Sequence, residues 1–262
     1  MKSLDWIGIS QIGAFILILT RISGVFIAAP LLGNRSVPDR VKLPLVIMLS
    51  FLLYPAVTHG KALVVSSHIQ LLTYIFEELT IGLTIGFVAS FLFSAVQIAG
   101  EIFGMQIGYS IATILDPTNQ ADEGVLTTLY TALAALFFLY LNGHHLILGS
   151  LAKSFEIIPI SHGFNMTVGF GISHLVEKFL LLAIQLASPV LIVVTVLNMI
   201  FGLISKVSPQ MNIYFNVGFI VGPILGIGVL ILSLPLFRML LMHMTEDLGP
   251  DLLKTIQELK AI

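Results

Sequence analysis

Four ionisable residues lie inside or beside long apolar runs of the chain, and they are the first candidates for chemistry. Arg21 interrupts the first run, Glu77 and Glu78 are adjacent in a later one, and Glu101 follows shortly after it. A charged side chain in apolar surroundings needs a partner or water, and such residues line ion paths, proton paths or helix pairs in membrane proteins. These residues therefore predict either a coupling site or charge pairs between helices or subunits.

Two adjacent histidines, His144 and His145, raise the question of a metal site. Adjacent side chains point in different directions on a helix or a strand, and no third ligand lies at helical spacing. We expect them to be polar residues at a helix end or an interface. The chain also lacks an H-E-x-x-H motif and any serine or lysine in a recognisable nucleophile context. The sequence favours a protein that is not an enzyme, with no metal or cofactor.

An ion-coupled small-solute transporter is the alternative from another class, with Glu77, Glu78 and Glu101 as its coupling site. Transporter folds often contain internal repeats with paired broken helices. The two halves of this chain show no convincing repeat, which counts against a transporter. An intramembrane hydrolase is a more remote alternative, because no nucleophile and base are paired.

The composition indicates a membrane or membrane-assembled protein. Of 262 residues, 57% are hydrophobic and only 10% are charged, whereas a soluble domain carries roughly 25% charged residues. The lipid membrane is thus an expected partner. The net charge of −2 does not provide the excess of positive charge that nucleic-acid binding requires. The chain has no cysteine, which excludes disulfides.

Six apolar stretches predict an all-α fold of about six long hydrophobic helices in a single domain, residues 1–262. A helix needs about 20 apolar residues to cross a bilayer, and no stretch alternates with period two. A charged tail helix is expected at about 246–262. Lysine and arginine are not biased to one side of these runs, so either some do not cross or partner subunits hold the chain. The stretches are Trp6–Ala29, Leu43–Val57, Leu71–Ile98, Gly124–Leu148, Phe179–Ser205 and Ile213–Leu236.

Glycines spaced four residues apart recur on three of the predicted helices, at Gly82 and Gly86, at Gly100, Gly104 and Gly108, and at Gly218 and Gly222. Small residues at this spacing let another helix backbone approach closely. They predict packing within the chain, contacts with other subunits, or both.

Two irregular segments interrupt the apolar runs. Asp116-Pro117 cannot lie inside a regular helix, because proline disfavours the helical conformation at the preceding residue. Irregular backbone at membrane depth must be buried in protein or line a water-filled cavity. The second segment, residues 205–212, is a turn with many hydrogen-bonding groups, among them Lys206, Gln210 and Asn212.

The chain resembles the FliR/SctT family of type III protein-export gate subunits over nearly its whole length. The resemblance rests on several motifs in this sequence. They are Arg21-x-x-Gly24-x-Phe26-x-x-Ala29-Pro30, Val37-Pro38-x-Arg40-Val41-Lys42, Glu78-x-x-x-Gly82-x-x-x-Gly86, Ala99-Gly100-Glu101 through Asp116-Pro117, Asn142-Gly143-His144-His145, and Gly202-Leu203-Ile204-x-Lys206-x-x-Pro209-Gln210-Met211-Asn212. The histidine motif and Asn216-Val217-Gly218-Phe219 are closer to the flagellar branch than to the injectisome branch, and the injectisome export gate is the alternative within the family.

The resemblance implies that one copy joins FliP and FliQ subunits in a gate at the bacterial inner membrane, within the flagellar basal body. It also implies that FlhB lies at the cytoplasmic entrance and that unfolded flagellar proteins pass through. The helices would form bent hairpins in that assembly instead of conventional crossings, which would explain the absent charge bias.

The resemblance further implies a plug-like loop at about residues 106–122 that closes the pore. Tyr109, Ile111, Ile114 and Leu115 would form the seal, with Asp116-Pro117 as its bend. Packing is assigned to the spaced glycines. Pairing between helices or subunits is assigned to the polar set Arg21, Glu78, Glu101, Lys206, Gln210 and Asn212.

Overall fold

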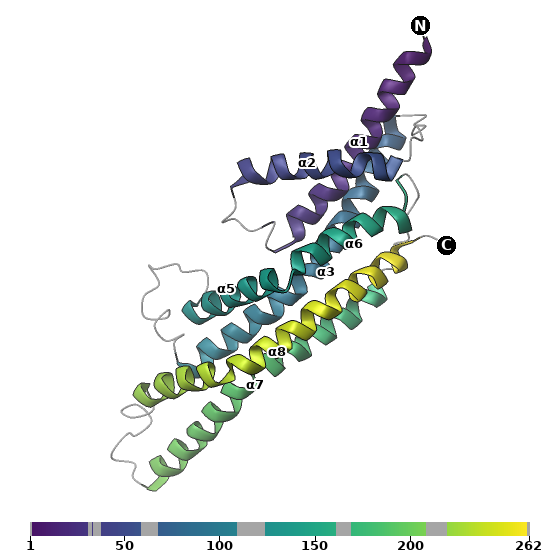
Figure 1. Ribbon diagram of the computed structural model, residues 1–262. Coiled ribbons are helices and arrows are strands. Elements are labelled where there is room, and N and C mark those ends of the chain that lie inside the picture. Colours follow the sequence, from purple (N-terminus) through teal and green to yellow (C-terminus); the bar gives the residue numbers. More distant parts are fainter. Residues whose placement is uncertain are drawn as a thin grey trace. The chain divides into compact units, whose positions relative to one another are not determined.

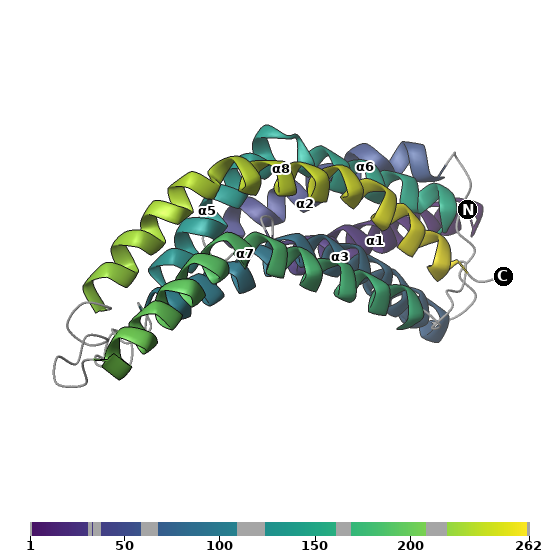
Figure 2. The same ribbon diagram turned by 90° about the horizontal axis from the view of Figure 1, so that it is seen from below.

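The computed structural model describes residues 2–30, 33, 38–58, 68–108, 124–160, 169–207 and 219–260. These ranges contain α-helices and no strand, and the order of the helices can be followed in Figure 1 and, from below, in Figure 2. The helices are α1 (Lys2–Ala28), α2 (Asp39–Thr58), α3 (His68–Ile107), α5 (Val125–Tyr140), α6 (Gly143–Ile157), α7 (Gly169–Val207) and α8 (Phe219–Leu259).

The prediction of an all-α membrane protein with about six long apolar helices is confirmed. Five helices, α1, α2, α3, α7 and α8, are long and apolar enough to cross a bilayer. The pair α5 and α6 passes the same criterion when taken as one broken span with a bend of 65°. Each of the six predicted apolar stretches overlaps one of these helices or the bent pair.

The bend between α5 and α6 lies at Asn142, within the stretch predicted as one apolar run. Asn142 adopts a left-handed backbone conformation, with φ 58° and ψ 27°. Asparagine tolerates this conformation better than most residues with a side chain. The amide of Leu141 still donates to the carbonyl of Phe137, so α5 ends immediately before the bend.

Helices α3 and α8 are among those that extend beyond the predicted apolar limits. α3 continues through the glycine-containing stretch to Ile107, and Gly108 has φ +83°. A glycine in this conformation commonly terminates a helix. The charged tail expected at 246–262 is the C-terminal part of α8, which runs without interruption to Leu259 and includes Gly249-Pro250.

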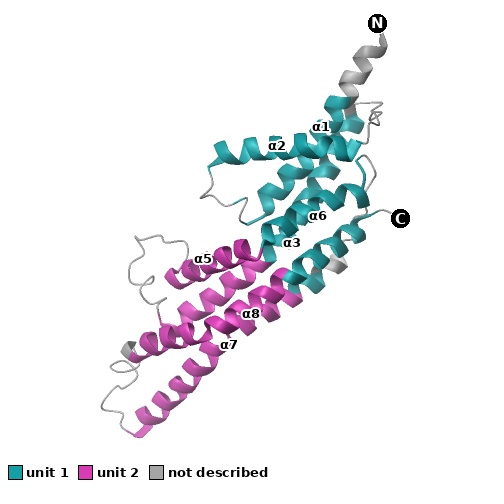
Figure 3. Cartoon of the chain, viewed as in Figure 1, with its two compact units in different colours: residues 1–91, 142–176, 246–262 teal, residues 92–141, 177–245 magenta. Residues whose placement is uncertain are grey.

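The chain divides into two compact units, coloured separately in Figure 3. Unit 1 comprises residues 1–91, 142–176 and 246–262, and unit 2 comprises residues 92–141 and 177–245. The long helices α3, α7 and α8 each contribute to both units.

The core of unit 2 contains a cluster of aromatic rings. Tyr130 of α5 is 1% exposed, and its ring lies 4.6 Å from that of Phe103 on α3 and 4.9 Å from that of Phe237 on α8, measured between centroids. A second pair, Phe93 and Phe138, joins α3 to α5 with centroids 5.4 Å apart. These edge-to-face and tilted contacts are the geometries that aromatic pairs favour, and they join three helices.

Candidate functional site

A buried ion pair lies within unit 1. Nε of Arg21, on α1, donates to Oε2 of Glu78, on α3, over 2.5 Å, and Nη2 donates to Oε1 over 3.0 Å. The side chain of Arg21 is fully buried and that of Glu78 is 3% exposed. Two parallel bonds between a guanidinium and a carboxylate give both strength and a defined orientation. The structure thus brings together two residues that the sequence marked as needing partners.

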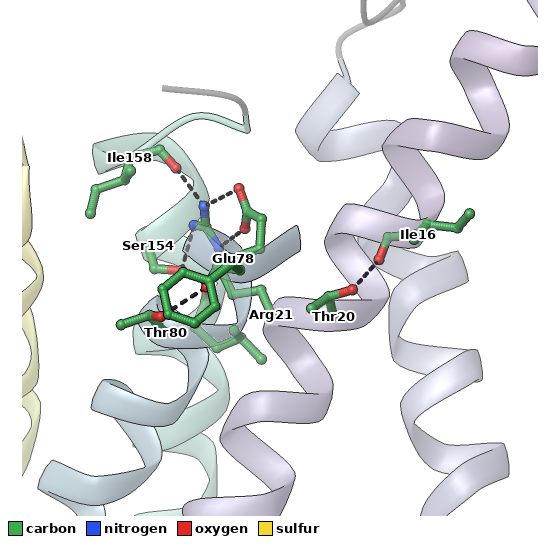
Figure 4. Close-up of polar contacts among 9 residues, drawn as sticks. Ile16, Thr20, Arg21, Glu78, Thr80, Ser154 and Ile158 are labelled. Atoms are coloured by element: carbon green, nitrogen blue, oxygen red, sulfur yellow. Dashed lines mark hydrogen bonds and ion pairs between the residues drawn. The ribbon is translucent and has the colours of Figure 1, made fainter. Parts of the chain in front are cut away.

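The same guanidinium contacts the C-terminal end of α6, as Figure 4 shows. Nη1 donates to Oγ of Ser154 over 3.1 Å, and Nη2 donates to the carbonyl of Ile158 over 3.0 Å. The guanidinium carbon lies 4.2 Å from the centroid of the Phe155 ring, within the range of a cation–π contact. We call Arg21, Glu78, Ser154, Phe155 and Ile158 the arginine cluster. It joins α1, α3 and α6.

Close backbone contact between α1 and α3 positions the arginine cluster. A Cβ added at Gly24 would lie 2.8 Å from the carbonyl oxygen of Leu79 on α3. A Cβ at Gly82 would collide with the carbonyl oxygen of Arg21, and one at Gly86 would lie 2.8 Å from that of Val25. These glycines allow the two helices to cross at backbone contact, beginning one turn from the ion pair.

The later glycines differ in what they contact. Gly100 packs against α5, because an added Cβ would lie 2.7 Å from the Cα of Thr127. Gly222 faces the carbonyl of Ile107, 3.8 Å from an added Cβ. A Cβ at Gly104 or Gly108 would meet nothing within 4 Å in the described part of the chain. The predicted stripe therefore divides into an internal contact at Gly100 and open positions beyond it.

The other predicted charges lie at the surface of the single chain. Glu101 and Lys206 are exposed, and the structure brings neither into an ion pair with another described residue. Their role in pairing between subunits stays a prediction. The predicted seal residues at 109–117, together with Gly218, Gln210 and Asn212, lie outside the described residues.

His144 and His145 lie in the first turn of α6, directly after the bend. Their ring centroids are 4.3 Å apart, and Nδ1 of His144 is buried without a hydrogen-bond partner among the described residues. No group of three potential ligand side chains suited to a metal occurs in the ranges that the structure describes.

Several long helices expose large apolar side chains. On α2, only Val46 and Ser50 are buried, while Phe51 is 75% exposed and Leu52 is 69% exposed. On α8, Leu232 is 80% exposed. Soluble monomers rarely expose contiguous apolar patches of more than a few hundred Å². These faces require lipid or partner subunits.

Sequence reasoning missed the α6 side of the arginine cluster. Its residues Ser154, Phe155 and Ile158 carry no charge, and they belong to none of the motifs on which the family resemblance rests. Their spacing puts them on one face of a helix end, but only the tertiary structure places Arg21 opposite that face. The partners of Arg21 on α6 therefore had no local signal.

Comparison with known proteins gives the family. A family model described as "Bacterial export proteins, family 1" matches residues 12–248. The chain belongs to this family of bacterial export proteins. The match begins within α1 and ends within α8, so it spans the helices of both units and includes the whole arginine cluster.

Curated relatives of this export family agree with the assignment. The chain is 32% identical to the flagellar biosynthetic protein FliR of Escherichia coli over 245 residues, which is 93% of each chain. It is 28% identical to FliR of Bacillus subtilis over 253 residues, or 95% of each. It is also 30% identical to the surface presentation of antigens protein SpaR of Shigella flexneri over 214 residues, or 80% of each.

Proposed function

We propose that this chain is a core subunit of the flagellar type III export gate, which helps to form and seal the channel for unfolded flagellar proteins. The proposal rests on the family match. The model of the bacterial export family matches residues 12–248 of this chain. Near full-length similarity to several flagellar biosynthetic proteins named FliR supports the flagellar branch. The role is structural and transporting, without a catalytic step.

The exposed apolar helices support a role inside a larger membrane assembly. Chains with the faces described for α2 and α8 are incomplete as isolated particles, because those faces must be covered. We propose FliP and FliQ subunits as the covering partners, with FlhB at the cytoplasmic entrance of the gate. The assembly would lie in the bacterial inner membrane, within the flagellar basal body.

Glu101 is the proposed point of charge pairing with a neighbouring subunit. It is exposed on α3, inside the candidate span 69–107. A carboxylate at such a position is stable beside water or a cation. Next to it, Gly104 leaves open space on the helix surface. A partner helix that carries a lysine or arginine would fit this surface.

The proposed seal is the segment that follows α3. Tyr109, Ile111, Ile114 and Leu115 would form an apolar plug, bent at Asp116-Pro117. Opening would be a displacement of this segment when a substrate or partner engages, which is a two-state loop change of a kind common in gated proteins.

Secretion in the source bacterium tests the proposed function. Removal of the gene should abolish export of hook and filament proteins, and the full-length chain supplied in trans should restore it. Similarity to SpaR also allows the injectisome gate as a second candidate. Loss of virulence-protein secretion with normal flagellar export would assign the chain to that branch and would contradict our proposal.

A further inference from the structure

The C-terminal end of α6 meets an arginine that belongs to a different helix. Arg21 contacts the end of α6 through the Ser154 hydroxyl and the Phe155 ring of its last turn and the carbonyl of Ile158, the residue that follows the helix. We propose that Arg21 is a clamp that caps the end of α6 and fixes α6 on α1 and α3. Glu78 serves as the residue that positions the guanidinium.

The end of α6 lacks a cation of its own. A helix leaves its last carbonyl groups without intrahelical partners, and the C-terminus carries partial negative charge. The last turn of α6 contains no basic residue, and Glu156 adds a negative charge to it. Arg21 therefore supplies from α1 the positive charge and N–H donors that this helix end does not provide.

Glu78 orients the guanidinium toward α6. Its two oxygens accept from Nε and Nη2 of Arg21, which fixes the plane of the group. Nη1 and the second N–H of Nη2 then point to Ser154 and Ile158. The buried charge is neutralised by Glu78, and its other donors are directed to the helix end.

The groups of α6 that contact Arg21 attract a cation and repel an anion. A carbonyl oxygen and the face of an aromatic ring both carry negative partial charge. The hydroxyl of Ser154 already donates to the carbonyl of Leu151 over 2.7 Å, so it is an acceptor toward residue 21. If Arg21 and Glu78 exchanged places, a carboxylate would face Ile158 and Phe155, and α6 would lose its cap.

This asymmetry separates a clamp from a simple ion pair between α1 and α3. If Arg21 and Glu78 formed only an ion pair, their charges could be exchanged, and the double variant R21E/E78R would keep the contact between α1 and α3. Such an exchangeable pair would also tolerate R21K, because lysine keeps the charge. A clamp tolerates neither change. The lysine ammonium is a compact charge without the planar fork, and it cannot hold both Glu78 oxygens while it bonds to Ser154 and Ile158.

Hydrogen exchange on the full-length chain, purified with the subunits that accompany it, tests the clamp directly. We expect R21K to accelerate amide exchange at the end of α6, residues 154–160, by about tenfold, since a lost charge-assisted hydrogen bond changes an opening equilibrium by that order. The matched control is R238K, the same substitution at an exposed arginine of α8. It should leave exchange in α6 unchanged.

A distance measurement between α1 and α6 tests the double variant R21E/E78R, in which the two charges are swapped. The natural chain has no cysteine, so spin labels attached at I12C on α1 and E156C on α6, both exposed positions, report only the separation of these helices in unit 1. We expect one narrow distance in the parent chain and a broad distribution in R21E/E78R. This experiment does not depend on export activity, so its failure is distinct from failure of the proposed gate function.

Three results would overturn the clamp. The first is an amide exchange rate at residues 154–160 of R21K that lies within about twofold of the rate in the parent chain. Such a change is smaller than the loss of one charge-assisted hydrogen bond would give. The second is a uniform acceleration over all helices, which would show a global stability effect and not a local cap. The third is recovery of the narrow distance in R21E/E78R. If the double variant does not fold, R21K alone decides between the clamp and the exchangeable pair.

Discussion

Replacing Gly82 with alanine should destabilise the chain, whereas the same replacement at Gly104 should not. Both residues lie on α3 in glycine patterns of the same spacing, and the sequence gives no reason to separate them. The structure separates them by what an added methyl group would meet. At Gly82 it would meet the carbonyl oxygen of Arg21 and, at 3.1 Å, the Cα of Gly24, while at Gly104 it would meet nothing within 4 Å.

The size of the effect follows from two opposing terms. Overpacking against immobile backbone costs about 1–3 kcal/mol, and alanine in place of glycine inside a helix favours the helix by about 1 kcal/mol. A methyl group at Gly82 would collide with a backbone carbonyl oxygen, so the upper end of the overpacking range, about 3 kcal/mol, applies. After the propensity gain is subtracted, G82A should lower the free energy of unfolding by about 2 kcal/mol. With a shift of about 2–4 °C per kcal/mol for chains of this size, the expected fall in Tm is roughly 4–8 °C.

Thermal unfolding of the detergent-purified chain, followed by far-ultraviolet circular dichroism, measures both variants under one condition. G82A should unfold at lower temperature than the parent chain. G104A should unfold at the same or a slightly higher temperature, because only the propensity term acts there. Equal shifts for the two variants, or a larger loss for G104A, would refute the assignment of Gly82 to the α1–α3 crossing.

Three further predictions concern Glu101, the segment 111–119 and Tyr130. The charge reversal E101K should reduce recovery of partner subunits in a pull-down of the tagged chain, because an exposed acid inside a candidate span needs a cation or water; normal recovery together with normal export would exclude a pairing role. Deletion of part of 111–119 should raise ion leak across vesicles containing the assembled complex without reducing assembly, and an unchanged leak would exclude the plug. Y130F removes a buried hydroxyl that is hydrogen-bonded to Ser233, while it keeps the aromatic contacts. It should lower the free energy of unfolding by about 0.5–1.5 kcal/mol, and this loss is measured as a fall in Tm. A Tm equal to that of the parent chain would show that the hydroxyl contributes nothing to unit 2.

The helices were predictable because apolar runs of this length have few alternatives to a helix. Their ends were less predictable. α3 continues through glycines that the sequence singled out for close packing, and α8 continues through Gly249-Pro250 into the charged tail. In both cases helix contacts from the rest of the chain outweigh local propensity. The bend at Asn142 has its own local signal, Asn-Gly, which favours a left-handed turn residue.

The candidate site was predictable in part. A buried arginine needs an acceptor, so Arg21 and Glu78 could be marked as needing partners from their apolar surroundings. That they pair with each other depends on the crossing of α1 and α3, and contact with Ser154 depends on the fold of α6. Glycine spacing alone could not distinguish Gly100, which packs against Thr127, from Gly104, which is open.

We propose that this chain works as a subunit of a heteromeric membrane gate. The most direct test is the native mass of the complex extracted from the source membrane in mild detergent through a tag on this chain. We expect a single large species that contains this chain together with FliP-like and FliQ-like subunits. A monomer of 28.5 kDa without co-purifying partners would contradict it.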